Sequence, residues 1–203
     1  MSNATNDKII ADTQRWLERA VIGLNLCPFA KAVHIKKQIR YVVSNATTPE
    51  ALLEELINEL EFLAETSAEK VETTLLIHPG VLNDFLDYND FLDVAEATLD
   101  ELDLAGELQI ASMHPRYQFA DTQPDDMENY TNRSPYPTLH LLRESSVDRA
   151  VAAFPEAEHI FERNIETMKK LGHAGWDKLW SEQPAKNSGA ANDANFEKKP
   201  GEK

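Results

Sequence analysis

The sequence predicts a single α+β domain, in which helices pack on a mixed sheet of about four strands and a long ordered loop lies at the carboxyl edge of that sheet. Two observations predict this fold class. Short apolar or β-branched segments alternate with longer segments in which apolar residues recur at three- and four-residue spacings. The chain has 203 residues, of which 42% are hydrophobic, so it is long and apolar enough to bury one sizeable core.

The first part of the chain predicts a helix, a strand and a second helix. An amphipathic helix covers Thr13–Leu26 and ends before Pro28, because the residue before a proline avoids the helical conformation. The β-branched segment Ile39–Val43 predicts a strand. A helix then opens at Thr48-Pro49-Glu50, with proline at its first position. Its apolar face consists of Leu52, Leu53, Leu56, Leu60 and Leu63.

The next part predicts a strand–helix–strand unit. Thr73–Ile77 and Leu108–Met113 predict the strands. The helix between them has an apolar side made of Leu82, Phe85, Leu86, Leu92, Ala95, Leu99 and Leu102.

The last predicted strand is Thr138–Leu142, with Leu139 and Leu141 on one face and His140 on the other. Helices are expected at 146–154 and 157–171, and Gly172 ends the second of them. We expect one domain over residues 8–180 and a disordered tail over residues 181–203, which are rich in Asn, Ala, Lys and Gly.

Composition limits the classes of partner. The chain has 35 Asp and Glu against 20 Lys and Arg, a formal net charge of −15. Such a surface repels nucleic-acid phosphates and anionic lipid, so we expect neither nucleic acid nor membrane as a partner. Cys27 is the one cysteine, which excludes an intrachain disulfide and is typical of a reducing compartment. No signal-peptide pattern is evident, and we expect a cytoplasmic protein. The sequence does not set the oligomeric state.

Two histidines follow the strands of the strand–helix–strand unit, at His78-Pro79 and His114-Pro115. If the unit is a right-handed crossover, its strands run parallel, and both histidines lie at the carboxyl edge, where open α/β sheets bind ligands. Histidine titrates near neutrality, so His114 or His78 is the candidate general acid or base. The alternative is that each His-Pro only ends a strand.

The stretch from residue 114 to 144 predicts the long loop and its ligand-binding side chains. A connection of this length inside a compact domain is usually functional or disordered, and its aromatic residues argue for order. Its guanidinium, amide, hydroxyl and imidazole groups suit a carboxylate or phosphate, and the candidates are Arg116, Tyr117, Asn132, Arg133, Ser134, His140 and Arg143. Alternatively, this is an Asn-rich turn in which Arg133 pairs with Asp125 or Asp126.

Cys27 is open to two interpretations. If Pro28 begins a helix, the thiol lies at a helix N-terminus, which lowers its pKa and makes it a candidate nucleophile. The alternative is a buried, unreactive thiol. Cys27-Pro28-Phe29-Ala30 resembles the active-site start of some glutaredoxin-like proteins and omega-class glutathione transferases. Those folds place a strand before the cysteine, whereas this sequence predicts a helix there.

The cofactor is not determined by the sequence. It has no glycine-rich nucleotide-binding motif. A divalent metal is an alternative to a metal-free site, held by the histidines 78, 114 and 140 or, as Mg²⁺, by loop acids. Those acids are Asp121, Asp125, Asp126 and Glu128. The three histidines fit no local metal-binding spacing, so a metal-free site is our first expectation.

Three motifs resemble an uncharacterised bacterial family, domain of unknown function 1415. They are Gly23-Leu24-Asn25-Leu26-Cys27-Pro28-Phe29-Ala30, His114-Pro115-Arg116-Tyr117-Gln118-Phe119, and the run from Thr131-Asn132-Arg133-Ser134-Pro135 to Glu144. The resemblance covers about residues 10–175. It implies a cytosolic bacterial protein and supplies no mechanism, so the candidate site residues rest on the chemistry of the residues themselves.

Three hypotheses of function follow, and the sequence does not decide whether the protein is an enzyme. The first is a small enzyme that binds an anionic metabolite and uses histidine acid–base chemistry. The second is a non-catalytic interaction protein with an acidic helical surface. The third is a thiol-redox protein that uses Cys27. The first predicts that His114, Arg133 and Cys27, or a metal, gather in one cleft, whereas the second predicts that they are scattered.

Overall fold

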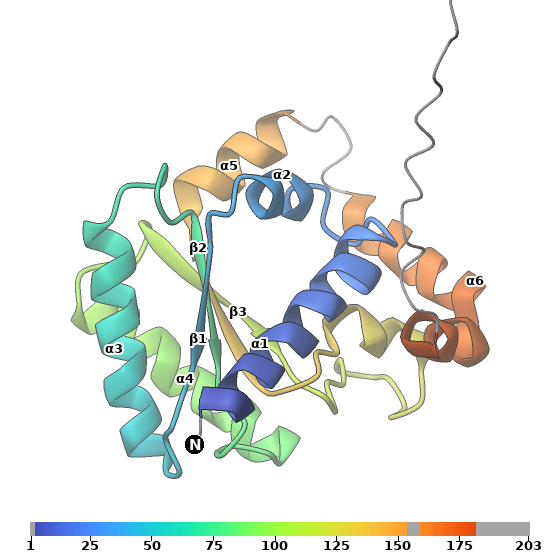
Figure 1. Cartoon of the computed structure of the whole chain (residues 1–203), viewed down its shortest axis with the longest axis horizontal. Helices are drawn as coiled ribbons and strands as arrows, with labels where there is room; N and C mark the ends of the chain where they lie inside the picture. Colours follow the sequence, from blue (N-terminus) through green and yellow to red (C-terminus); the bar gives the residue numbers. More distant parts are fainter. Residues whose placement is uncertain (1–2, 154–158, 182–203) are drawn as a thin grey trace, which may run out of the picture.

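The structure, a computed structural model, describes residues 3–153 and 159–181 and contains one four-stranded mixed sheet (Figure 1). The strands are β1 Ile39–Val43, β2 Thr73–Ile77, β3 Leu108–Met113 and β4 Thr138–Arg143. Their spatial order is β1-β2-β4-β3. The mixed α/β fold and the four predicted strands are thereby confirmed. Residues 154–158 and 182–203, where part of a predicted helix and most of the predicted tail fall, lie outside the described residues.

The directions of the strands place the long loop at one edge of the sheet. Strand β1 pairs parallel with β2, and β4 pairs antiparallel with both β2 and β3. The two strands of the strand–helix–strand unit therefore share a direction, as predicted, but β4 lies between them. The carboxyl ends of β2 and β3 and the amino end of β4 meet at the same edge. The loop from β3 to β4 consequently leaves and returns at that edge.

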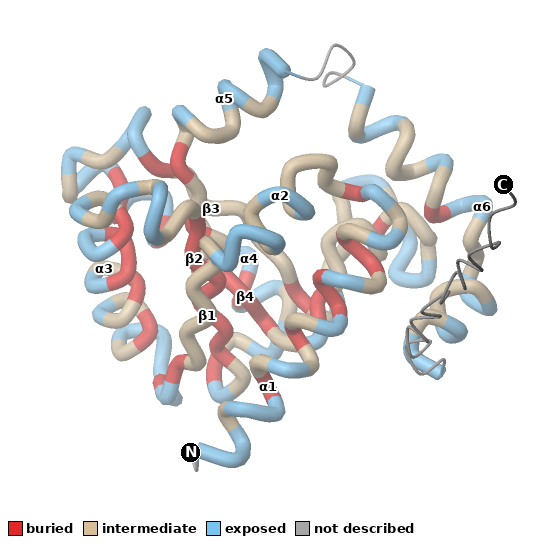
Figure 2. Tube along the Cα trace, turned by 45° about the horizontal axis from the view of Figure 1, so that its top comes forward, coloured by how far each residue is buried: buried red, intermediate tan, exposed pale blue. Residues whose placement is uncertain are grey.

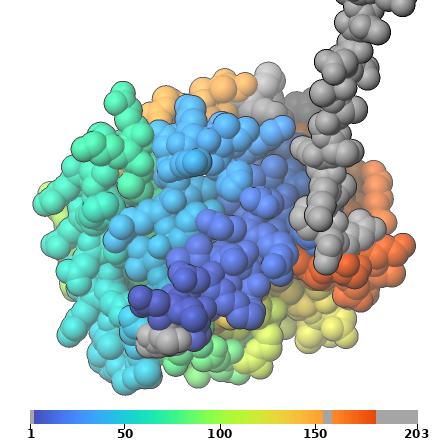
Figure 3. All heavy atoms as spheres, viewed as in Figure 1, coloured from blue at the N-terminus to red at the C-terminus, as the bar shows by residue number. Residues whose placement is uncertain are grey.

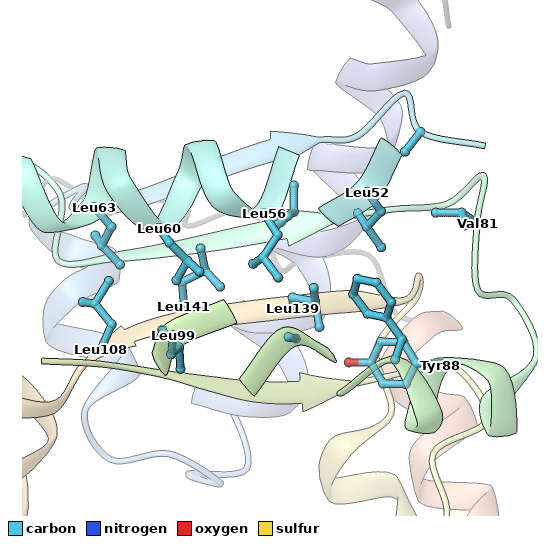
Figure 4. Close-up of a cluster of buried hydrophobic side chains, with 14 residues drawn as sticks. Leu52, Leu56, Leu60, Leu63, Val81, Tyr88, Leu99, Leu108, Leu139 and Leu141 are labelled. Carbon is cyan, nitrogen blue, oxygen red and sulfur yellow. The ribbon is translucent and has the colours of Figure 1, made fainter. Parts of the chain in front are cut away.

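One face of the sheet is covered by α3 (Pro49–Glu65) and α4 (Phe85–Glu101). Helix α3 begins as predicted, with the Thr48 side chain accepting a hydrogen bond from the Ala51 backbone N–H at 3.3 Å. Its leucines 52, 56, 60 and 63 pack against strand and α4 residues in the main hydrophobic cluster (Figure 4). Two residues predicted for the apolar side of α4 are not on it. Leu82 precedes the helix, which is capped by Asp84, and Leu86 is 70% exposed.

The opposite face is covered by the N-terminal helices α1 (Asn3–Trp16), η1 (Leu17–Ile22, a π-helix) and α2 (Ala30–Ile35). Figure 3 shows α1 and α2 over the centre of this face, between α3 on one side and α6 on the other. The predicted helix 13–26 was too late at its start and too long at its end. Residues 3–8 are mostly exposed and polar, so they carry no apolar stripe that predicts a helix.

The remaining helices lie around the edges. They are η2 (Met127–Asn132, a 3₁₀ helix in the long loop), α5 (Glu144–Ala153) and α6 (Ile160–Ser181). Gly172, with φ of 62°, breaks the helical backbone of α6 as predicted, but the helix then resumes. Helix α5 contains no buried residue (Figure 2). In α6, Met168 is buried. None of the helices in the described residues is long and apolar enough to span a membrane.

Candidate functional site

His78 and His114 lie at the same edge of the sheet and on the same face, but they are fully buried. Both side chains are 0% exposed. The Tyr88 ring of α4 contacts both imidazoles, with centroids 5.7 Å from His78 and 5.1 Å from His114. The predicted proximity of the two residues is therefore observed, in an aromatic cluster that also includes Phe85. Their burial separates them from a ligand at the surface.

The neighbours of the two imidazoles indicate which nitrogen carries the proton. His78 Nδ1 lies 3.1 Å from the Val81 carbonyl and donates to it, whereas His114 Nδ1 accepts from the Arg116 backbone N–H at 3.0 Å. The Nε2 atoms of both residues have no hydrogen-bond partner within the described part of the chain. Burial lowers the pKa of His78 to about 4 and also lowers the pKa of His114. Both are neutral at physiological pH.

The arginines predicted to bind an anion donate mainly to carbonyl groups of the protein itself. Arg116 Nη2 donates to the Asn83 carbonyl at 2.7 Å and to the Asp84 carboxylate at 3.1 Å. Arg133 donates to carbonyl groups of the long loop, and its guanidinium lies 4.1 Å above the Tyr130 ring.

Arg143 is 9% exposed and donates to the carbonyl groups of Leu63, Thr66 and Val71. It thus connects β4 to the end of α3.

The other predicted loop residues also have internal contacts. Asn132 Nδ2 donates to the Ser112 carbonyl at 3.2 Å, and Ser134 Oγ donates to the Tyr136 carbonyl at 2.6 Å. The Tyr117 ring packs 5.2 Å from Phe85. These contacts make the long loop an ordered structure, and Arg133 does not pair with Asp125 or Asp126 in it.

His140 lies on the opposite face from His78 and His114. It pairs in register with Leu75 and Ala111, while its neighbours Leu139 and Leu141 point into the α3/α4 cluster. Because side chains alternate along a strand, the three histidines cannot meet at one metal ion. No group of three His, Cys, Asp or Glu side chains among the described residues is arranged to hold a metal, and this includes the acids of the loop.

A large cleft lies on the face of the sheet that carries His140. Its volume is about 830 Å³, within the range of ligand sites. The floor consists of side chains from all four strands, including Leu75, Met113 and His140. The segment from Trp16 to Lys36 supplies the opposite wall, and α5 supplies one side. We call this the central cleft. Four predicted site residues line it: Cys27, Asn132, His140 and Arg143.

Cys27 reaches the central cleft through the turn that follows η1. Gly23 follows the π-helix, and its Cα lies so near the preceding turn that a Cβ on it would be 2.3 Å from the Arg19 carbonyl oxygen. Asn25, with φ of 55°, then reverses the chain before Cys27. Burial raises the pKa of the Cys27 thiol, despite hydrogen bonds from the Phe29 and Ala30 backbone N–H groups. The expected lowering by a helix N-terminus is therefore outweighed, and the thiol is neutral.

His140 presents a basic nitrogen on a defined tautomer. Thr73 Oγ1 donates its hydrogen to the Leu141 carbonyl, so it can only accept from His140 Nε2, 2.8 Å away. His140 Nε2 then carries the proton, and Nδ1 carries the lone pair. Burial lowers the pKa of His140 to about 4.

Sequence reasoning missed the side chains that come from outside the motifs. Gln109, Lys36 and Arg149 also line the central cleft, and Trp16 lies between it and a second cavity. Strand parity could have found Gln109, because it shares a face of β3 with Met113. The positions of Lys36 and Arg149 depend on how α2 and α5 pack, which the sequence pattern does not give.

The second cavity, which we call the outer cleft, has a volume of about 500 Å³ and lies between α1, the long loop and α6. It contains two more predicted residues, Arg133 and Ser134. The predicted site residues are thus divided among the buried edge, the central cleft and the outer cleft. In particular, His114, Arg133 and Cys27 do not share one cleft.

Comparison with known proteins identifies a family but assigns no activity. The family model described as "Protein of unknown function (DUF1415)" matches residues 8–178 of the chain. No curated protein and no solved structure is significantly similar to it. Any mechanism must therefore come from the geometry of the clefts.

Proposed function

The chain belongs to the DUF1415 family, and we propose that it binds a small organic anion with an apolar body in the central cleft, where His140 exchanges a proton with the ligand. One observation carries this proposal. His140 and Cys27, from a strand and from the N-terminal segment, line the same cavity of about 830 Å³. Large apolar cavities with a few polar groups are the usual form of small-molecule sites.

The walls of the central cleft indicate an apolar ligand body. Most of its floor is aliphatic, with Ile39, Leu75 and Ala111 among the lining residues. Facing them, Leu17 and Val21 belong to a buried cluster. A ligand that filled this space with hydrocarbon would gain roughly 25 cal/mol per Å² of apolar surface removed from water.

The rim of the central cleft indicates the charge of the ligand. Lys36 and Arg149 line the cleft and are exposed. The Arg149 guanidinium lies 3.3 Å from the Glu72 carboxylate in an exposed ion pair, which is weak enough to be exchanged for a ligand carboxylate. The lining holds three cations, Lys36, Arg143 and Arg149, against two acids, Glu69 and Glu72. In a protein of net charge −15, this local positive excess favours an anion.

A bound anion would also prepare His140 for acid–base chemistry. Without a ligand, the His140 pKa of about 4 makes this imidazole a weak base. A negative charge nearby raises a histidine pKa toward neutrality. The His140–Thr73 hydrogen bond fixes the ring, so Nδ1 would accept or return the proton. The neutral Cys27 thiol does not favour the alternative of thiol-redox chemistry in the ligand-free protein.

The single cysteine provides a test. We expect octanoate to slow the reaction of Cys27 with 4,4′-dithiodipyridine in a saturable way. Octanamide, the neutral analogue, should need an about tenfold higher concentration, because it lacks the charge-assisted contact. Protein unfolded in urea, with the same ligands, is the control for direct effects on the reagent. Equal protection by octanoate and octanamide would exclude the anionic ligand class, and no protection by either would exclude this site.

A further inference from the structure

The outer cleft gathers all three tryptophans of the chain. Trp16, Trp176 and Trp180 line it together with Tyr130 and Tyr136. Tyr130 and Trp176 meet edge to face with centroids 5.2 Å apart, as do Trp176 and Trp180. None of these three rings is therefore stacked parallel on another. Trp and Tyr at this density are typical of recognition surfaces, because they offer large rigid faces.

The charges in the outer cleft leave one guanidinium available. Asp12 is the acid of this cleft, and although burial opposes its ionisation, hydrogen bonds from Lys8 and Tyr136 lower its pKa. Lys8 is the close ion partner of Asp12. Arg15 Nη1 also pairs with Asp12 Oδ1, but at 3.5 Å and with a side chain that is 54% exposed, so this second pair is weak enough to be exchanged for a ligand. Since Lys8 already compensates Asp12, Arg15 and Arg133 give this cleft a positive excess.

We infer that the outer cleft is a second small-molecule site, for a planar aromatic carboxylate. The ring of such a ligand would pack against Trp176, Trp180 and Tyr130, and its carboxylate would bind the Arg15 guanidinium. Guanidinium and carboxylate match in a bidentate geometry. The volume of about 500 Å³ suits one bicyclic molecule with its solvent-facing end. This inference rests on different residues from the proposed function and does not depend on it.

The test follows the indole N–H signals in NMR spectra of ¹⁵N-labelled protein. The three tryptophans give three such signals. The probe is indole-3-acetate, and indole-3-acetamide is its neutral match. We expect saturable shifts of the Trp176 and Trp180 signals, with an about tenfold lower Kd for the carboxylate. Arg15→Gln should remove this preference and leave the binding of the amide unchanged. Lys31→Gln, which deletes an exposed positive charge on α2, should keep it.

The inference would be overturned by no saturable shift of Trp176 and Trp180, by equal Kd values for the two probes, or by an unchanged preference in Arg15→Gln. A proline-rich peptide that shifts the same signals while indole-3-acetate does not would also overturn it, in favour of polypeptide recognition.

The thermal midpoint of Arg15→Gln, which should match that of wild type, shows whether a loss of binding is a loss of fold. Should that variant unfold, Arg15→Lys, which keeps the charge but not the bidentate fork, must weaken the carboxylate preference.

Discussion

The two faces of the sheet differ in how completely they are filled. On the α3/α4 face, leucines from both helices and from β3 and β4 form one continuous cluster of fully or nearly fully buried side chains. On the α1 face, two smaller clusters flank the central cleft. The comparison separates two tasks. The filled face stabilises the fold, and the incompletely filled face is the one available to a ligand.

Each face also carries a neutral histidine, but the two environments differ. His78 is fully buried on the filled face, whereas His140 is partly exposed and lines the central cleft. Burial lowers the pKa of both to about 4. Only at His140 can a ligand reverse this effect. The following predictions test the contrast between the faces.

The largest expected effect is on stability. Leu56, in α3, is 0% exposed, and Leu56→Ala should lower the free energy of unfolding by about 2–5 kcal/mol. Met113, which is only partly buried, lines the central cleft, so Met113→Ala should cost about 1 kcal/mol or less. Urea unfolding of both variants measures the difference. Equal losses would contradict the distinction between a filled and an open face.

Acid should destabilise the protein through three histidines whose pKa is lowered by burial: His78, His114 and His140. A histidine pKa near 4 in the folded protein lies below the ordinary value of 6.5, so the folded state keeps the neutral form. The stabilisation is complete above about pH 6.5, and it declines as the pH falls toward the folded pKa of about 4. Between about pH 6.5 and 5, His78 and His140 should each contribute a loss of roughly 2 kcal/mol.

Two measurements separate these histidines. In His78→Gln, the loss of unfolding free energy over that pH range should be smaller than in wild type, and His140 and His114 should account for part of what remains. Octanoate, if it binds beside His140, should reduce the remaining pH dependence in this variant. The same pH dependence in His78→Gln and in wild type would show that His78 does not stay neutral in the folded state.

The smallest stability effect concerns the rim. Arg149→Gln breaks the exposed pair with Glu72 and should change the free energy of unfolding by about 0.5 kcal/mol or less. It should nevertheless reduce the preference of the central cleft for octanoate over octanamide, measured by protection of Cys27. Lys31→Gln again serves as the matched loss of one positive charge. Loss of the preference in both variants would indicate a general effect of net charge instead of a contact.

Much of the secondary structure followed from local signals. The leucine period and the Thr48-Pro49 start defined α3, and short β-branched or apolar segments defined the four strands. The start of α1 was missed, because its first two turns face solvent and have no apolar pattern. The insertion of β4 between β2 and β3 was also missed, since pairing partners far apart in sequence leave no local trace.

The sequence by itself determined the residue types of the candidate site and the edge where the long loop lies. It also determined, through the period of two in β4, that His140 faces away from Leu139 and Leu141. Only the tertiary structure decided which of those residues meet. It buried His78 and His114 against Tyr88, bound Arg143 to three carbonyl groups, and brought Cys27 and His140 to one cleft. The physical reason is that burial and carbonyl contacts arise where elements pack, and packing joins residues that no sequence period relates.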